Sequence, residues 1–138
     1  MTDFKVQLRL RLDWSEMDVL GHVNNVSYFK YIQAARVNYW ELCGMPAFNE
    51  ISIGPVLLST GCRFIKPLFY PGNITIYTCM EFIKNTSYGF HHKIINENNE
   101  LAAEAHDVIV NYDFTHKINV PVSNEFRTII KNIEGIEK

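Results

Sequence analysis

Residues 14–28 read Trp14-Ser15-Glu16-Met17-Asp18-Val19-Leu20-Gly21-His22-Val23-Asn24-Asn25-Val26-Ser27-Tyr28. Asp18 lies in a polar segment, and Gly21, three residues later, permits a tight backbone path. His22, Asn24 and Asn25 follow directly, and a short polar side chain at such a place can cap a helix. The stretch therefore predicts a polar loop that ends at the N-terminus of a helix.

The segment after this loop has the apolar spacing of a helix. One stripe recurs at intervals of four, three, four and three residues: Tyr28, Ile32, Ala35, Tyr39 and Leu42. Further apolar residues lie outside that stripe: Phe29, Tyr31, Val37 and Trp40. A helix that is apolar on several sides is normally wrapped by other structure. We expect it to begin at Asn24, Asn25 or Ser27 and to end at Gly44 and Pro46.

The remaining segments favour strands. Strands are expected over residues 6–12, 55–65, 74–82, 87–95 and 101–113, because apolar residues alternate or cluster there between turn residues. In the third of these, Ile74, Ile76, Met80 and Phe82 should share one face. A short amphipathic helix should follow Pro121. One apolar helix and about five antiparallel strands predict an α+β domain, 1–138, with the sheet curved around one long central helix.

Composition limits the classes of protein that fit. The chain has 138 residues, which suits a single domain, and a formal net charge of −2, which offers no general field for nucleic acid. Residues 1–5 contain no apolar signal segment, and no apolar run approaches the roughly 20 residues of a membrane span. We therefore expect a cytoplasmic protein without a membrane span.

Cysteine and histidine spacing gives no metal motif. Cys43, Cys62 and Cys79 are far apart and form no close pair, which favours free thiols in a reducing compartment over a disulfide or zinc site. His91 and His92 are neighbours on an expected strand and should point to opposite faces. We therefore expect no metal and no cofactor.

The polar loop before the helix suits acyl chemistry. A helix N-terminus offers unpaired N–H groups and partial positive charge, which can stabilise a developing oxyanion. A carboxylate such as Asp18 beside it can activate water or attack a carbonyl. Acidic and amide side chains before a helix also serve as simple caps, so the pattern alone leaves both interpretations open.

A resemblance to a known family favours the first interpretation. Asp18-x-x-Gly21-His22-Val23-Asn24-Asn25-x-x-Tyr28 resembles the signature of the 4-hydroxybenzoyl-CoA thioesterase-like hotdog family. Weaker matches follow: Phe29-Lys30-Tyr31-Ile32-x-x-Ala35-Arg36, Phe64-x-x-Pro67-x-x-x-x-Gly72 and Val110-x-Tyr112-Asp113. The resemblance implies a sheet wrapped around a long helix. It also implies a homodimer or homotetramer in which protomers pair edge to edge with active sites at the interface.

The resemblance implies a role for each residue of the loop. Asp18 matches the family's catalytic aspartate, and backbone N–H groups near Asn24 and Asn25 take the oxyanion role. Gly21 and His22 would help to orient the site, and His22 matches a histidine of relatives that act on acyl carrier protein. Three residues are expected to line the substrate pocket: Tyr28, Ser59 and Thr60.

Two departures from the family pattern keep alternatives open. Leu20 replaces an asparagine of the carrier-protein relatives, and Ala34 replaces a helical glutamate that many members carry. Asp18 is then the only convincing acid, since Glu16 should point away from it. We expect an acyl-CoA thioesterase. The alternatives are an acyl-carrier-protein thioesterase, a non-catalytic acyl-CoA binding module and, less favoured, an enoyl-CoA hydratase, whose D-x-N-P-x-H arrangement is incomplete here. The sequence does not specify the acyl group.

Overall fold

The structure, a computed structural model, describes residues 4–45, 52–136 and 138. In chain order its elements are β1 (Val6–Arg11), the 3-10 helix η1 (Trp14–Glu16), α1 (Asn25–Leu42), β2 (Ile53–Phe64), β3 (Asn73–Ile83), β4 (Ser87–Ile95), β5 (Leu101–Asp113), β6 (Ile118–Asn119) and α2 (Asn124–Glu134). The predicted order is confirmed, with two short additions, η1 and β6. None of the described helices has the length and apolarity required to cross a membrane.

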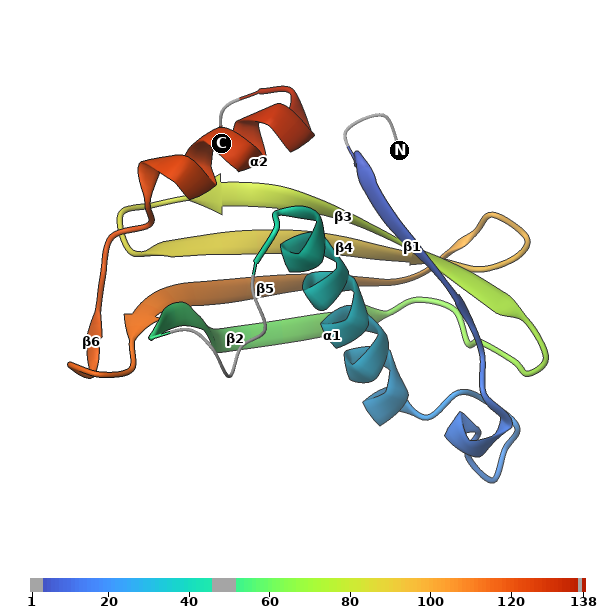
Figure 1. The fold of residues 1–138 in the computed structure, drawn as a ribbon. Coiled ribbons are helices and arrows are strands. Elements are labelled where there is room, and N and C mark those ends of the chain that lie inside the picture. Colours follow the sequence, from blue (N-terminus) through green and yellow to red (C-terminus); the bar gives the residue numbers. More distant parts are fainter. Residues whose placement is uncertain (1–3, 46–51, 137) are drawn as a thin grey trace.

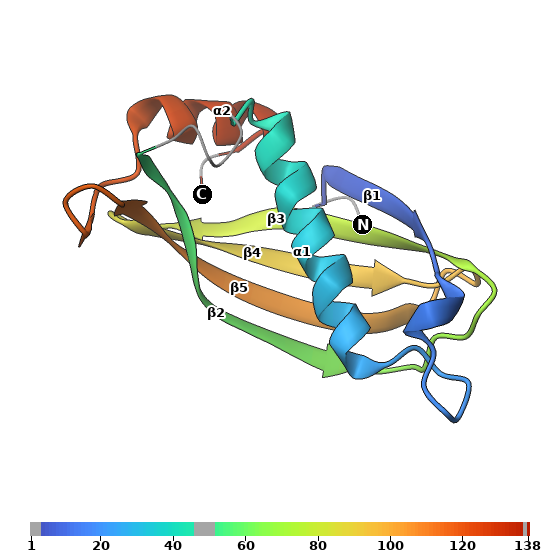
Figure 2. The same cartoon turned by 60° about the horizontal axis from the view of Figure 1, so that its bottom comes forward.

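All the strands pair antiparallel in one sheet of order β1-β3-β4-β5-β2, and β6 adds to the end of β5. Helix α1 crosses one face of the twisted sheet, while α2 covers one end of it (Figures 1 and 2). Neither α1 nor α2 lies on the opposite face of the sheet (Figure 1). This α+β arrangement, with one long helix against an antiparallel sheet, is the predicted one.

Helix α1 begins and ends close to the expected residues. The side chain of Asn24 caps it by accepting a hydrogen bond of 2.9 Å from the N–H of Val26. Gly44 lies just past its end with φ of +77°, a conformation that glycine adopts without strain. Pro46 lies outside the described residues. The predicted apolar stripe is wrong at its last member, because Leu42 is 59% exposed and a spacing of four continues the stripe to the buried Cys43.

Strand β3 departs from the predicted alternation at a bulge. Its register with β4 shifts between Met80 and Phe82. The shift turns Phe82 away from the buried face and places its ring over Gly89, where an added Cβ would lie 2.2 Å from the ring. The prediction that Phe82 shares a face with Met80 is therefore wrong, because a bulge reverses the two-residue alternation beyond it.

The core between sheet and α1 has two apolar halves. One surrounds the first part of α1: Leu12, Val23, Tyr28, Tyr31, Ile32, Ala35, Leu68, Ile74, Ile76, Ile94, Ala102, Ala103 and Ala105. The other surrounds its last part and α2: Val6, Tyr39, Trp40, Cys43, Met80, Tyr88, Phe90, Ile109, Val122 and Ile130. Between the two halves lie four buried polar residues, which we call the polar belt: Arg36, Thr78, His92 and Asp107.

The polar belt is a closed set of hydrogen bonds centred on Asp107. Its carboxylate accepts from the Arg36 guanidinium at 2.9 Å and from the Thr60 hydroxyl at 2.7 Å, and lies 2.6 Å from Nε2 of His92. Nδ1 of His92 lies 2.8 Å from the Thr78 hydroxyl. Because His92 sits in a fully buried position, it is neutral, donates from Nε2 to Asp107 and accepts at Nδ1 from Thr78.

Burial lowers the pKa of His92, because the imidazolium would lose its hydration. Burial acts to raise the pKa of Asp107, yet the hydrogen bonds from His92 and Thr60 and the charge of Arg36 outweigh it and hold that pKa low. The belt therefore contains one buried ion pair, Arg36–Asp107, and one neutral imidazole. None of these contacts could be inferred from sequence spacing, because the partners come from α1 and four strands, β2 to β5.

We expect acidification to destabilise the fold through His92. Unfolded His92 takes up a proton near its ordinary pKa of about 6.5, while the folded side chain stays neutral. The free energy of unfolding should therefore fall, by up to about 1.4 kcal/mol per pH unit from this residue, as the pH drops below about 6.5. Urea titrations at a series of pH values should show a shallower slope for His92→Asn. Equal slopes for the two proteins would contradict the neutral assignment.

Candidate active site

The loop from Asp18 to His22 is closed by its own hydrogen bonds. The Asp18 N–H donates to the His22 carbonyl at 2.7 Å, and the Gly21 N–H donates to the Asp18 carbonyl at 3.1 Å. The Asp18 oxygen Oδ1 accepts from the N–H groups of Leu20 and His22 at 2.9 and 3.2 Å. Gly21 has φ of +81°, which explains the glycine in this turn. One carboxylate oxygen is thus fixed by backbone donors, and Oδ2 accepts no hydrogen bond from the described residues.

A second segment packs against this loop and completes the site. The Val23 N–H donates to the Leu68 carbonyl at 2.9 Å, and the backbones of His22 and Phe69 form an isolated antiparallel β-bridge. The rings of His22 and Phe69 also meet edge to face, with their centroids 5.0 Å apart. This brings the chain after β2 beside a loop more than 40 residues earlier. His22 therefore orients Asp18 through its backbone N–H, while its ring contacts Phe69.

A hollow of about 330 Å³ opens between these segments. Its lining residues are Asp18, His22, Val23, Asn25, Tyr28, Phe64, Ile65, Lys66 and Pro67. Asn25 is the first residue of α1, and its N–H meets no acceptor among the described residues. The hollow therefore joins a half-buried carboxylate to a free N–H at the positive end of a helix.

The wall of the hollow opposite Asp18 is aromatic. The ring of Tyr28 meets that of Phe64 edge to face at 5.0 Å, and its hydroxyl reaches the Lys66 carbonyl at 3.5 Å. Burial raises the pKa of Tyr28, so this phenol stays protonated and serves as a donor. An apolar wall with one hydroxyl suits the acyl part of a substrate better than a charged group.

The other acid of the loop is occupied elsewhere. The Glu16 carboxylate accepts from the Asp13 N–H at 3.0 Å and from the Tyr31 hydroxyl at 2.7 Å. It therefore closes η1 and lies outside the lining of the hollow, as expected. No acidic side chain from α1 reaches the hollow in the described part of the chain, which agrees with alanine at position 34.

The structure gathers most of the predicted site residues but leaves others apart. Asp18, His22, Asn25 and Tyr28 line the hollow directly. Gly21 shapes the loop and Asn24 caps the helix. Ser59 and Thr60 lie on β2 away from this hollow, where the Thr60 hydroxyl is bonded to Asp107. Phe64 and Pro67 appeared in the sequence only as part of a weak family match, without a predicted place in the site. They border the hollow because the following residues, Leu68 and Phe69, pair with the loop at Val23 and His22.

Comparisons with known proteins identify the family and the fold. Residues 12–130 match the family model of the thioesterase-like superfamily, so the chain belongs to that superfamily. It is 23% identical, over 64% of this chain and 67% of the relative, to 4-hydroxybenzoyl-CoA thioesterase of Pseudomonas sp. (strain CBS-3). The hotdog fold and the thioesterase class predicted from the sequence are thereby confirmed.

Solved structures show the same fold over almost the whole chain. A thioesterase from Thermus thermophilus, complexed with coenzyme A and Zn, superposes with a TM-score of 0.89 at 23% identity and covers 100% of both chains. DHNA-CoA thioesterase from Staphylococcus aureus has a TM-score of 0.83 at 16% identity and covers 94% of this chain and 90% of its own. These likenesses describe the fold.

Proposed function

We propose that Asp18 catalyses the hydrolysis of an acyl-CoA thioester in the hollow beside α1. One observation carries this proposal: the Asp18 carboxylate and the unpaired N–H of Asn25 line the same hollow, against an aromatic wall. The relative from Pseudomonas is named for an aromatic acyl-CoA substrate, and the Thermus relative was solved with coenzyme A. Both names support a CoA thioester as the substrate class.

Each group then has a chemical task. The thioester oxygen accepts from the Asn25 N–H, where the helix end stabilises the negative charge that develops on it. Asp18 removes a proton from water as that water attacks the carbonyl carbon. The tetrahedral intermediate collapses and expels the CoA thiolate, which takes the proton held by Asp18. The two backbone donors on Oδ1 fix the carboxylate, and Oδ2 remains available as the base.

A thiol-release screen over aromatic, short-chain and long-chain acyl-CoAs tests the activity. We expect hydrolysis of at least one class. Loss of absorbance from an enoyl-CoA without thiol release would instead favour a hydratase. A tight complex with a non-hydrolysable acyl-CoA analogue, with no thiol released from any substrate, would favour a binding module. Faster hydrolysis of an acyl-carrier-protein thioester than of the matching acyl-CoA would reassign the carrier.

The oxyanion role of Asn25 can be tested without damaging the helix. Asn25 is the first helical residue, where proline is well tolerated, and Asn24 before it has the extended conformation (φ −61°, ψ 140°) that proline requires. Asn25→Pro removes the N–H together with the carboxamide, and kcat should fall about 10²- to 10³-fold because the N–H is lost. Asn25→Ala keeps the N–H and is the matched control. Similar rates in the two variants, with both folded by circular dichroism, would exclude the assignment.

We also propose that the protein is a homodimer, or a tetramer of such dimers, paired through β2. Strand β2 lies at the edge of the sheet and pairs only with β5 within the described chain. Its apolar side chains are exposed, including Leu57, Leu58 and Phe64 at 40%, 67% and 47%. A long apolar edge is a template for pairing with another chain. Because Phe64 also borders the hollow, a partner at this edge would close the site.

Leu58→Glu should separate the protomers. Leu58 lies at the register shift of β2 and makes no ladder pair with β5, so a charge there should leave the protomer's own sheet intact. Sedimentation equilibrium should give a multiple of 16.0 kDa for the parent and 16.0 kDa for the variant. A monomeric parent at micromolar concentration would overturn the proposed assembly.

A further inference from the structure

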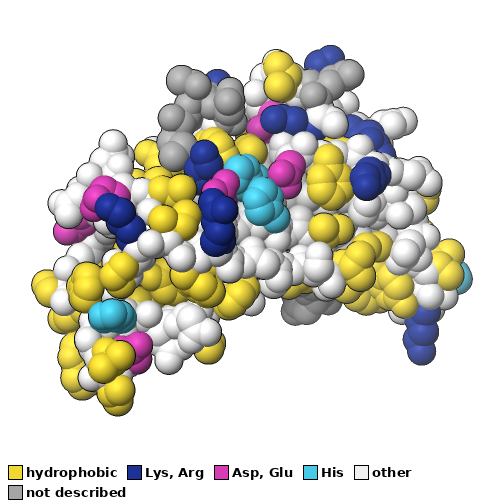
Figure 3. Space-filling view, turned by 180° about the vertical axis from the view of Figure 1, so that it is seen from behind, with side chains coloured by type: hydrophobic (Ala, Val, Ile, Leu, Met, Phe, Trp, Pro, Cys, Tyr) yellow, Lys and Arg dark blue, Asp and Glu magenta, His cyan; other side chains and the backbone are white. Residues whose placement is uncertain are grey.

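The outer face of the sheet, opposite α1, carries a cluster of histidine and acidic side chains. Figure 3 shows two histidines side by side near the middle of this face, with acidic side chains on either side. His91 of β4 and His106 of β5 are direct cross-strand partners, and their rings stack at 4.3 Å with an interplanar angle of 16°. The expected opposition of His91 and His92 is confirmed, since His92 belongs to the buried polar belt.

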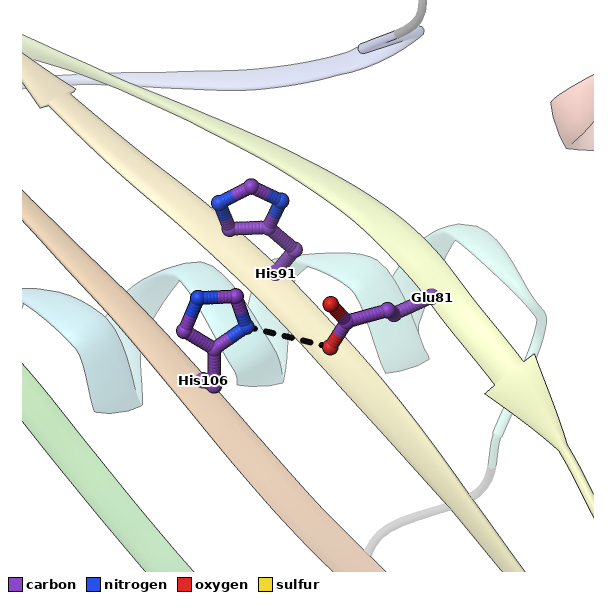
Figure 4. Close-up of side chains that lie close together, drawn as sticks. All are labelled: Glu81, His91 and His106. Atoms are coloured by element: carbon purple, nitrogen blue, oxygen red, sulfur yellow. Dashed lines mark hydrogen bonds and ion pairs between the residues drawn. The ribbon is translucent and has the colours of Figure 1, made fainter.

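Glu81 joins this pair from a third strand. Its carboxylate lies on the same outer face, since Glu81 follows the buried Met80, and is 3.1 Å from Nδ1 of His106. One potential ligand atom of each of Glu81, His91 and His106 lies within 4.8 Å of the other two. Figure 4 shows the two imidazoles beside each other, with the Glu81 carboxylate turned toward them.

We propose that Glu81, His91 and His106 bind one divalent transition-metal ion of the Zn²⁺ kind on the outer face of the sheet. Two imidazoles and a carboxylate are a common ligand set for such ions. In a tetrahedral site with metal–ligand bonds of about 2.1 Å, ligand atoms lie about 3.4 Å apart. One Glu81 oxygen and Nδ1 of His106 already lie 3.1 Å apart, close to that value.

The hydrogen bonds around the cluster favour a metal over a simple ion-pair ladder. Nε2 of His91 lies 2.6 Å from the Glu104 carboxylate, so Nε2 carries the proton and donates it in a hydrogen bond to Glu104. The lone pair of Nδ1 is then available to a metal ion. A metal-binding histidine characteristically donates its other N–H to a carboxylate in this manner. Glu104 is thus the positioning residue for His91. The Arg63 guanidinium lies 3.5 Å from the Glu104 carboxylate and balances its negative charge. The negative charge that binds the metal ion is therefore that of Glu81.

The surroundings leave a coordination position open. A hollow bordered by Gly61, Arg63, Glu104 and His106 adjoins the cluster, and Gly61, the cross-strand partner of His106, adds no side chain there. Lys93, the cross-strand partner of Glu104, lies over the ring of Phe4. The Phe4 ring itself meets the His91 ring at 5.1 Å, on the side of the cluster away from the hollow's His106. A bound ion would therefore keep water or an added ligand as its fourth partner, and would link β3, β4 and β5.

Titration calorimetry with Zn²⁺, and absorption spectra with Co²⁺ as a coloured substitute, test this site on the intact protein. We expect one ion per chain, a rise in Tm and tetrahedral Co²⁺ bands. His106→Ala and Glu81→Gln should each weaken binding by at least tenfold. Glu104→Gln should weaken it about 10- to 100-fold, because it keeps the three ligands but removes the negative charge beside the Nε2–H of His91. His116→Ala changes another exposed histidine bonded to an acid and is the matched control.

The free thiols of Cys43, Cys62 and Cys79 are the alternative ligands for Zn²⁺, and the variants distinguish them from the proposed site. Binding that persists unchanged in His106→Ala and Glu81→Gln, or the absence of Zn²⁺ binding below millimolar concentration, would overturn the proposal. His106 and Glu81 are both exposed, with 52% and 40% of their side-chain surface open, so the variants should fold. Far-UV circular dichroism checks this before each titration.

Discussion

Asp18→Asn should reduce kcat for acyl-CoA hydrolysis by about 10³-fold or more, because the side chain loses both its charge and its capacity to take a proton. Asparagine is nearly the same size, and its carbonyl oxygen can still accept from the N–H groups of Leu20 and His22. The loop and helix should therefore keep their conformation. A steady-state thiol-release assay, with the Tm of both proteins measured in parallel, gives the comparison.

Glu16→Gln is the matched control for this experiment. Glu16 is two residues away and is also a loop carboxylate, but its contacts are to Asp13 and Tyr31 rather than to the hollow. The Glu16→Gln substitution should lower the Tm slightly, because it weakens structural hydrogen bonds worth about 1 kcal/mol each. It should change kcat by less than about threefold, because Glu16 does not line the hollow. Retention of full activity by Asp18→Asn would remove Asp18 from the mechanism.

Asp107→Ala should lower the free energy of unfolding by about 3–5 kcal/mol, because it leaves the Arg36 guanidinium buried without its counter-charge. It also removes acceptors from His92 and Thr60. Urea or thermal unfolding followed by circular dichroism measures the change. An effect of this size would leave little of the stability of an ordinary domain, so partial unfolding at room temperature is an expected outcome.

Glu104→Gln controls for the loss of a carboxylate from the same strand. Glu104 faces the outer side of β5, where its pairs with Arg63 and His91 are partly open to water. Without added metal, its replacement should cost less than about 1 kcal/mol. A loss below about 1 kcal/mol for Asp107→Ala as well would show that Arg36 finds water or another partner when Asp107 is removed.

The sequence predicted the elements that depend on local pattern. The stripe of α1, the strand Leu101–Asp113 and the cap at Asn24 all follow from spacing and side-chain chemistry, and they agree with the structure. The errors occur where tertiary contacts, rather than local spacing, determine which side chains are buried. Leu42 follows a spacing of three where the buried face needed four, and Phe82 lies beyond a bulge that alternation cannot foresee.

The candidate site was predictable only in its first half. Asp18, His22 and Asn25 are close in sequence, so a motif could gather them. Tyr28 of the aromatic wall belongs to the same motif. Phe64, at the end of β2, and the segment after it reach the hollow because the loop pairs with Leu68 and Phe69. The polar belt and the Glu81–His91–His106 cluster join residues from separate strands, and strand order cannot be read from spacing along one strand.

The polar belt also bears on how the strands find their partners. A slip of β5 by two residues against β4 would keep every apolar side chain on the buried face, since side chains alternate with a period of two. Apolar patterning therefore cannot reject that misalignment. In the sheet slipped toward Tyr88, however, Asp107 would leave His92 and Arg36 and lie in the core half that contains Tyr88 and Ile109. The buried ion pair thus makes a shifted sheet costly, and selects one alignment among those that hydrophobicity alone would accept.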